Sequence, residues 1–194
     1  MPLLQGEGGA RLIDTPDPAN AGRPARRLFA LVAVLALTSY AADQASKAWA
    51  VAALTDAPPR DLVGSVLRLV LIRNPGAAFS IGTGNTWVLS VLAVVVLVVV
   101  VRTSRRLGSL GWAWAFGLLL GGALGNLTDR LTRPPSFGQG HVIDFIDYNG
   151  WFVGNVADIV IVAAAGLIAV LAQRGIGVDG RRQPRATRHT GPQS

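Results

Sequence analysis

Four long apolar segments constrain what this chain can fold into more than any other feature of its sequence. They cover residues 28–54, 87–101, 110–127 and 151–172, and the second is almost entirely Val and Leu. A helix that crosses a bilayer needs about 20 mostly apolar residues. We therefore predict an all-α integral membrane protein with four transmembrane helices, the second of which draws further residues from 78–86.

The composition excludes an ordinary water-soluble protein. Only 15% of the residues are charged and 51% are hydrophobic, whereas a soluble domain carries about 25% charged residues. Residues 1–27 and 173–194 lack apolar periodicity and are rich in Arg, Gly and Pro, so we predict two disordered tails around one membrane domain at 28–172. The first apolar segment is longer than the hydrophobic region of a signal peptide, and three more apolar segments follow it. We therefore interpret it as an uncleaved membrane anchor.

The positions of Arg and Lys predict the orientation of the chain. Twelve of the 18 basic residues lie in the two tails and in the connection between the second and third segments. Basic residues collect on the cytoplasmic side, so both termini are predicted to be cytoplasmic and the connections 55–86 and 128–150 to face outward. The net charge of +7 then marks the face that touches anionic lipid, and it requires no nucleic acid.

The outward connections have some structure of their own. Residues 66–72 have the composition of a strand, with alternate leucines on one face, and 73–76 supply a turn. We predict a short strand or hairpin at the membrane surface. Asp147 and His141 in the later connection are expected to be solvated loop residues.

Ionisable residues inside or beside a membrane span are costly and are candidates for function. In this chain they gather near the outward ends of the predicted helices: Asp43, Lys47, Asp129, Arg130, Asp144, Asp147 and Asp158. Asp43 and Lys47 are four residues apart, so we predict an intrahelical ion pair near the membrane surface. We expect Asp129 to be structural.

Helical spacing indicates which of these residues share a face. Asn155 and Asp158 are three residues apart and point the same way, as Asn126 does with Asp129 and Arg130. If the last helix begins near residue 151, Asp158 lies about 10 Å below its start. Gly121, Gly122 and Gly125 allow close approach of a neighbouring helix.

Asp144 arrives between these two polar faces on a segment that returns to the membrane. Two carboxylates held close together share one proton, because both cannot ionise easily. The ionised member can deprotonate a water molecule while the protonated member hydrogen-bonds a substrate carbonyl. Such a pair needs no metal ion and no other cofactor, and with no Cys and only two His we expect neither.

Five sequence blocks in one order carry a resemblance to a known family. The blocks are DQASK at 43–47, RNPGAAFS at 73–80, GGALGNLTDR at 121–130, VIDFI at 142–146 and NVAD at 155–158. Together they strongly resemble lipoprotein signal peptidase (signal peptidase II), over about residues 28–172. The family usually has Phe before the last Asn and a small polar residue after the last Asp, where this chain has Gly154 and Ile159. This departure concerns local packing beside the site more than its chemistry.

The resemblance implies an aspartic endopeptidase of the bacterial inner membrane, with Asp144 and Asp158 as its catalytic pair. It implies that lipid-modified prolipoproteins are cleaved on the amino side of the diacylglyceryl-cysteine. The family's substrate-lining positions fall on Asn74, Asn126, Arg130 and Asn155 of this sequence. The implied fold is four helices with a small extracytoplasmic β-cradle and a short periplasmic helix.

Two other classes of function stay open at this point. One is a small proton-coupled transporter, although its polar residues would spread across the membrane depth, and the chain has no internal repeat. The other is a noncatalytic lipid-binding scaffold. Nothing in the sequence requires more than a monomer.

Overall fold

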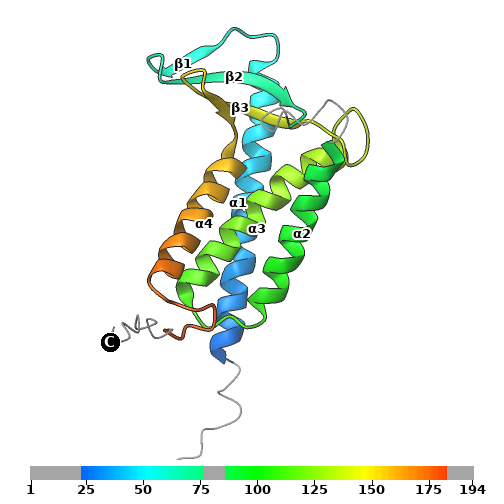
Figure 1. Ribbon diagram of the computed structural model, residues 1–194. Helices are drawn as coiled ribbons and strands as arrows, with labels where there is room; N and C mark the ends of the chain where they lie inside the picture. Colours follow the sequence, from blue (N-terminus) through cyan, green and yellow to red (C-terminus); the bar gives the residue numbers. More distant parts are fainter. Residues whose placement is uncertain (1–22, 77–85, 183–194) are drawn as a thin grey trace, which may run out of the picture.

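The computed structural model describes residues 23–76 and 86–182, with side chains from Arg26 onward. Four helices run side by side, and a small sheet lies across one end of them (Figure 1). The helices are α1 (Arg23–Leu54), α2 (Thr86–Ser104), α3 (Leu110–Thr132) and α4 (Val156–Gln173). Each is long and apolar enough to cross a membrane, which confirms the predicted four spans. Within the predicted start of α2, residues 78–85 lie outside the described residues.

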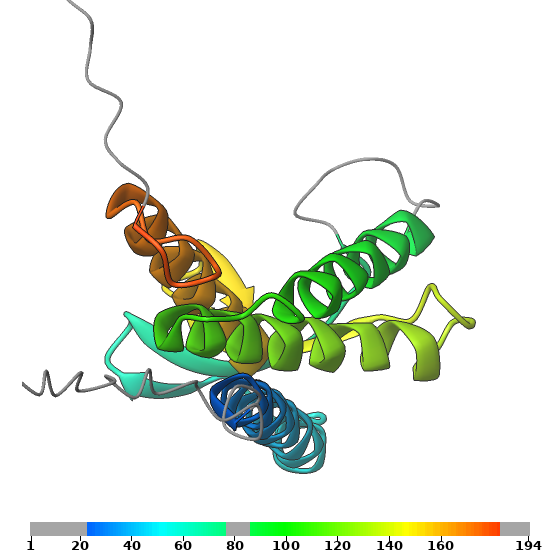
Figure 2. The same ribbon diagram turned by 90° about the horizontal axis from the view of Figure 1, so that it is seen from below.

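Helix α3 is the centre of the bundle. It packs against α1, α2 and α4, which surround it when the molecule is seen along the bundle (Figure 2). Its glycines make this possible: a Cβ at Gly121 would lie 2.7 Å from the carbonyl oxygen of Ala36 in α1, and one at Gly122 would lie 2.7 Å from that of Ala157 in α4. Small residues at these points let two neighbours approach the backbone of α3 from different sides.

The sheet is antiparallel and joins two distant parts of the chain. Its order is β1 (Arg60–Val63), β2 (Leu67–Asn74), β3 (Val142–Tyr148) and β4 (Phe152–Gly154). The predicted strand at 66–72 is therefore present, but it pairs with β3, which lies about 70 residues later and carries Asp144 opposite Ile72. The all-α description fits only the membrane-spanning part.

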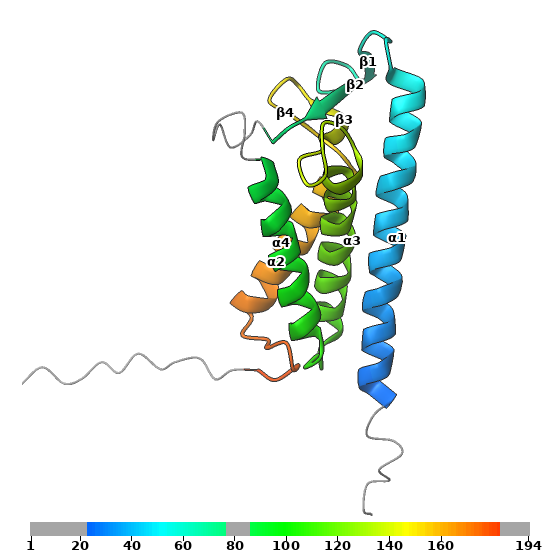
Figure 3. The same ribbon diagram turned by 90° about the vertical axis from the view of Figure 1, so that its right-hand side faces the viewer.

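The outer end of α1 supports the sheet. Figure 3 shows α1 extending along the bundle up to the sheet. An apolar cluster fills the space between them and includes Ala50, Leu54, Leu69, Leu71, Ile143 and Phe145. The ring of Trp49 meets that of Phe145 edge to face, with centroids 6.3 Å apart. This packing fixes the height of β3 above the helices.

The last helix begins later than the apolar pattern predicts. We expected a start near residue 151, but residues 152–154 form β4 and α4 begins at Val156. Asp158 therefore lies in the first turn of α4 and not 10 Å into it. The reason is the N-cap: the Asn155 side chain accepts a hydrogen bond from the backbone N–H of Asp158, and Asp158 accepts one from that of Asn155.

The opposite end of the bundle is closed by the chain after α4. The backbone N–H of Gly108 donates to the carbonyl of Val178 at 2.9 Å, and Trp112 Nε1 donates to that of Ile176 at 2.9 Å. Val178 also packs against the apolar core of this end. Residues 174–182 of the region predicted as a tail thus form a turn docked on the α2–α3 connection.

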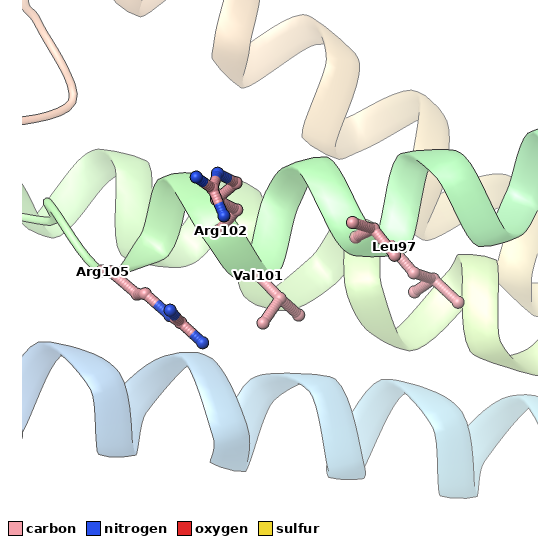
Figure 4. A pocket seen from close by; sticks show the side chains of 5 residues that line it. Leu97, Val101, Arg102 and Arg105 are labelled. Carbon is pink, nitrogen blue, oxygen red and sulfur yellow. The ribbon is translucent and has the colours of Figure 1, made fainter.

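A shallow groove marks α2 at the same end. It is lined by Leu97, Val98, Val101, Arg102 and Arg105. In Figure 4 the side chains of Val101 and Arg105 point toward α1, across the space that separates the two helices. The outward connections contain no short helix within residues 55–76 and 133–155, so the short helix implied by the resemblance is not found there.

Candidate active site

Asp144 is held in the middle of β3 by two amide donors. Asn74 Nδ2, at the end of β2, donates to Oδ2 at 2.7 Å. Asn155 Nδ2, at the N-cap of α4, donates to Oδ1 at 2.6 Å. The residue is only 3% exposed. The sequence placed Asp144 on a returning segment, and the structure adds the strand pairing that brings Asn74 to it.

Asp158 is held by the cap of its own helix and by α3. The backbone N–H of Asn155 donates to its Oδ2 at 3.0 Å, and Asn126 Nδ2 donates to its Oδ1 at 3.0 Å. The residue is half-buried.

Asn155 connects the two carboxyl groups. Its amide nitrogen binds Asp144, its backbone N–H binds Asp158, and the residue itself is 1% exposed. The four predicted residues Asn74, Asn126, Asp144 and Asp158 therefore surround a single buried asparagine, although they come from β2, α3, β3 and α4. An arrangement of this kind can hold a water molecule between a carboxylate and a carboxylic acid.

The surroundings of Asp144 raise the pKa of its carboxyl group. Burial raises the pKa of Asp144 to about 6, against the opposing effect of the hydrogen bonds from Asn74 and Asn155. Within this net value, the nearby Asp158 also raises the pKa and the charge of Lys47 lowers it. A carboxyl group with a pKa near neutrality can both take and give a proton.

Arg130 reaches the same site from α3. Its guanidinium lies close enough to Asp144 and Asp158 to interact electrostatically with both. One of its nitrogens, Nη1, is buried and has no hydrogen-bond partner among the described residues. A buried donor without a partner is costly, so this N–H is available to a ligand that enters the site.

Lys47 lies beneath the site and is the residue that the sequence reasoning underestimated. The predicted ion pair with Asp43 is confirmed at 2.8 Å, and both residues are 0% exposed. The ammonium also binds Asp129 Oδ2 at 2.9 Å and Asn126 Oδ1 at 2.9 Å. The signal for this was present in the sequence, since an apolar helix tolerates an isolated Lys only with partners on a neighbouring helix.

Asp129 has the structural role that we expected. Besides Lys47, it binds Arg133 Nε at 2.6 Å and accepts the backbone N–H of Ile143 at 3.2 Å. It therefore ties the end of α3 to β3, one residue before Asp144.

The prediction for Asp147 was wrong. It is 4% exposed, lies in β3 and pairs with Arg68 of β2 at 2.6 Å. Hydrogen bonds from the Gly150 backbone and from Arg68 hold the pKa of Asp147 below its usual range. The sequence analysis missed the pair because the partners are 79 residues apart. His141, by contrast, does lie in a loop and is half-buried.

Comparison with known proteins identifies the family. Residues 35–173 match the family described as Signal peptidase (SPase) II. The chain belongs to the signal peptidase II family. It is 47% identical to the lipoprotein signal peptidase of Leifsonia xyli subsp. xyli, with 86% of this chain and 80% of the relative covered. It is also 47% identical to that of Streptomyces griseus subsp. griseus, with 90% and 87% covered.

As a member of the signal peptidase II family, this chain is a peptidase, and its four apolar helices indicate a multi-pass membrane protein. The transporter and the noncatalytic scaffold are therefore set aside as functions. A solved bacterial membrane enzyme has the same fold, with a TM-score of 0.62 and 24% identity over 76% of this chain and 92% of the other. The roles of individual residues rest on the geometry described above.

Proposed function

We propose that this signal peptidase II hydrolyses one peptide bond with Asp144 and Asp158 as its catalytic pair. The observation that carries the proposal is the bridge made by Asn155, whose side chain holds Asp144 at 2.6 Å and whose backbone holds Asp158 at 3.0 Å. Two carboxyl groups held by one residue, one in β3 and one in α4, stay close together and share one proton.

The proton transfers follow from that shared proton. The ionised carboxylate removes a proton from water, and the water oxygen attacks the carbonyl carbon of the substrate. The protonated carboxyl donates to the carbonyl oxygen while the tetrahedral intermediate forms. The C–N bond then breaks, and the leaving amine takes the proton from the carboxyl that received it from water. As the carbonyl re-forms, its oxygen returns a proton to the other carboxylate, and the pair again holds one proton.

Arg130 and Asn74 are the residues that we assign to substrate binding around this pair. The buried Nη1 of Arg130, which has no partner among the described residues, can donate to a substrate carbonyl or to a lipid phosphate. Asn74 and Gly76 form the turn after β2, where Asn74 Oδ1 accepts the backbone N–H of Gly76 at 2.8 Å. Asn126 and Asn155 complete the lining by orienting the two carboxyl groups.

The substrate that we propose is a lipoprotein precursor, because the relatives are named lipoprotein signal peptidases. We propose cleavage on the amino side of the lipid-modified cysteine, with the lipid remaining in the bilayer beside the bundle. The sheet end then faces outward from the bacterial inner membrane, and both termini are cytoplasmic. This orientation agrees with the Arg-rich end opposite the sheet.

Substitution of the two carboxyl groups tests the proposal. Asp144→Asn and Asp158→Asn each remove one proton acceptor with little change of volume, so each is expected to lower kcat by at least about 1,000-fold. The assay follows release of the signal peptide from a diacylglyceryl-modified precursor, with the unmodified precursor as a substrate control. Asp61→Asn, on an exposed residue of β1, is the matched control and should leave the rate unchanged. Cleavage retained by either site variant contradicts the mechanism.

A further inference from the structure

The site contains three asparagine side chains, and an asparagine can present either an oxygen or an N–H group. Which atom faces a carboxyl group decides whether that group is stabilised as an anion or as an acid. We infer that Lys47 is a positioning residue, whose buried ammonium fixes the Asn126 amide so that its N–H group faces Asp158. The inference rests on the proposed function of the carboxyl pair and adds a residue to it.

The contacts of Lys47 leave one orientation of Asn126. The ammonium has three N–H donors and no acceptor, and it has three partners: Asp43 Oδ2 at 2.8 Å, Asp129 Oδ2 at 2.9 Å and Asn126 Oδ1 at 2.9 Å. Lys47 is 0% exposed, so water does not compete for these donors. The Asn126 atom that faces the ammonium must accept, and it is therefore the oxygen.

The other end of the same amide is then a donor. Asn126 Nδ2 lies 3.0 Å from Asp158 Oδ1. A rotation of the amide by half a turn would place two donors against each other at Lys47 and two acceptors against each other at Asp158. The ammonium, which makes the shorter of the two hydrogen bonds to Asn126 Oδ1, thus favours the donor on the side that faces Asp158.

Asn155 is fixed in a different way, and this difference makes the role of Lys47 testable. Its oxygen accepts the backbone N–H of Asp158 at 3.1 Å in the helix cap, so its nitrogen necessarily faces Asp144 at 2.6 Å and Asn126 Oδ1 at 3.2 Å. Loss of Lys47 removes the shorter of the two hydrogen bonds to Asn126 Oδ1, leaves the one from Asn155 Nδ2 at 3.2 Å, and leaves the helix cap intact.

The charge of Lys47 is largely offset where it lies. Asp43 and Asp129 both contact it, and Arg133 in turn binds Asp129. The charged groups that face the carboxyl pair from the surrounding described elements are Asp43, Lys47, Asp129 and Arg130. Two of these groups are acidic and two are basic. Substitutions at position 47 that have the same charge but differ in their N–H donor therefore separate the effect of the Asn126 orientation on the pH profile from the effect of the net charge.

Two neutral substitutions at position 47 separate the amide orientation from the charge. Lys47→Met has no donor, so only Asn155 Nδ2, at 3.2 Å, still holds the Asn126 oxygen. The amide then turns more easily, which places its oxygen toward Asp158 and favours a second proton on the pair. The acidic limb of the kcat profile should then move up by about one pH unit, with kcat lower by about 10- to 100-fold and KM nearly unchanged. Lys47→Gln is equally neutral but keeps an N–H donor, and it should restore at least half of the pH shift.

A third variant keeps the inference testable if Lys47→Met does not fold. Asn126→Asp preserves the acceptor that faces Lys47 and replaces the donor that faces Asp158 by an acceptor, so the acidic limb should move up further than in Lys47→Met. Thermal melting in detergent establishes which variants are folded. The infrared band of the protonated carboxyl, followed against pH without substrate, gives a readout independent of cleavage.

A folded Lys47→Met variant with the wild-type pH profile overturns the inference, as does an unmoved acidic limb in Asn126→Asp. A lower kcat with no shift of the profile also overturns it, since that result indicates a structural role only. Failure of the catalytic proposal looks different: in that case Asp144→Asn or Asp158→Asn retains cleavage, whatever the variants at position 47 do.

Discussion

The two ends of this helical bundle use the same kinds of charged residue in opposite ways. At the sheet end, Lys47 contacts Asp43 and Asp129 at 2.8 and 2.9 Å, and these side chains are at most 1% exposed. At the other end, Arg181 and Asp179 are 3.8 Å apart, with side chains 89% and 53% exposed. The sheet covers the first group and only a short turn lies near the second. Burial, not charge, therefore separates the residues that build a site from those that mark a membrane face.

Removal of one buried carboxylate is expected to give the largest change in stability. Asp129→Asn leaves Lys47 and Arg133 without a full counter-charge and weakens the tie to β3. We expect the free energy of unfolding to fall by about 3–5 kcal/mol, measured by denaturation in detergent micelles. Arg181→Gln is the control at the opposite end and should cause no measurable change, because exposed ion pairs contribute little. Equal losses in the two variants would contradict the comparison.

A single added methyl group beside the proposed catalytic pair should affect activity more than stability. A Cβ at position 154 would lie 2.6 Å from Phe152 Cε1 and 2.9 Å from Asp158 Oδ2. Gly154→Ala therefore displaces the carboxyl, and kcat is expected to fall by about 10- to 100-fold in the precursor assay. A rate within twofold of wild type would mean that the region beside α4 adjusts more easily than its packing indicates.

The pH dependence of cleavage should depend on the buried carboxyl groups at the sheet end and not on charged groups at the opposite end. Since burial raises the pKa of Asp144 to about 6, acidification below that value adds a second proton to the pair and removes the base. Activity should fall as the pH drops through about 6. Asn74→Ala removes a donor that stabilises the ionised form, so its acidic limb should lie higher by about half a unit to one unit. Ser104→Ala, at the other end of α2, should leave the profile unchanged.

The smallest expected change in stability and activity comes from a substitution in the apolar half of α4. A Cβ at Gly166 would meet no atom within 4 Å, so Gly166→Ala adds helix propensity without a clash. We expect a gain in unfolding free energy of about 0.5–1 kcal/mol and unchanged kcat, both measured beside Gly154→Ala. A loss of activity here would show that the two halves of the molecule are more strongly coupled than the contacts indicate.

Sequence patterns predicted the features that depend on local spacing. The four apolar segments gave the four spans, and the Asp43 and Lys47 spacing gave their ion pair. Patterns failed where a distant partner decides the structure. Asp147 was expected in solvent because Arg68 is 79 residues away, and the start of α4 was placed too early because Trp151–Gly154 is apolar enough to continue a helix.

The sequence by itself determined that this chain lies in a membrane, which residues its helices present on a common face, and which carboxyl groups are too costly to be accidental. These properties follow from hydrophobicity and from the helical repeat, which act over a few residues. Only the tertiary structure decided that Asn155 joins Asp144 to Asp158 and that Lys47 orients Asn126. Hydrogen bonds between residues far apart in the chain depend on the pairing of β2 with β3 and on how closely α3 approaches α1 and α4, and no local pattern records those distances.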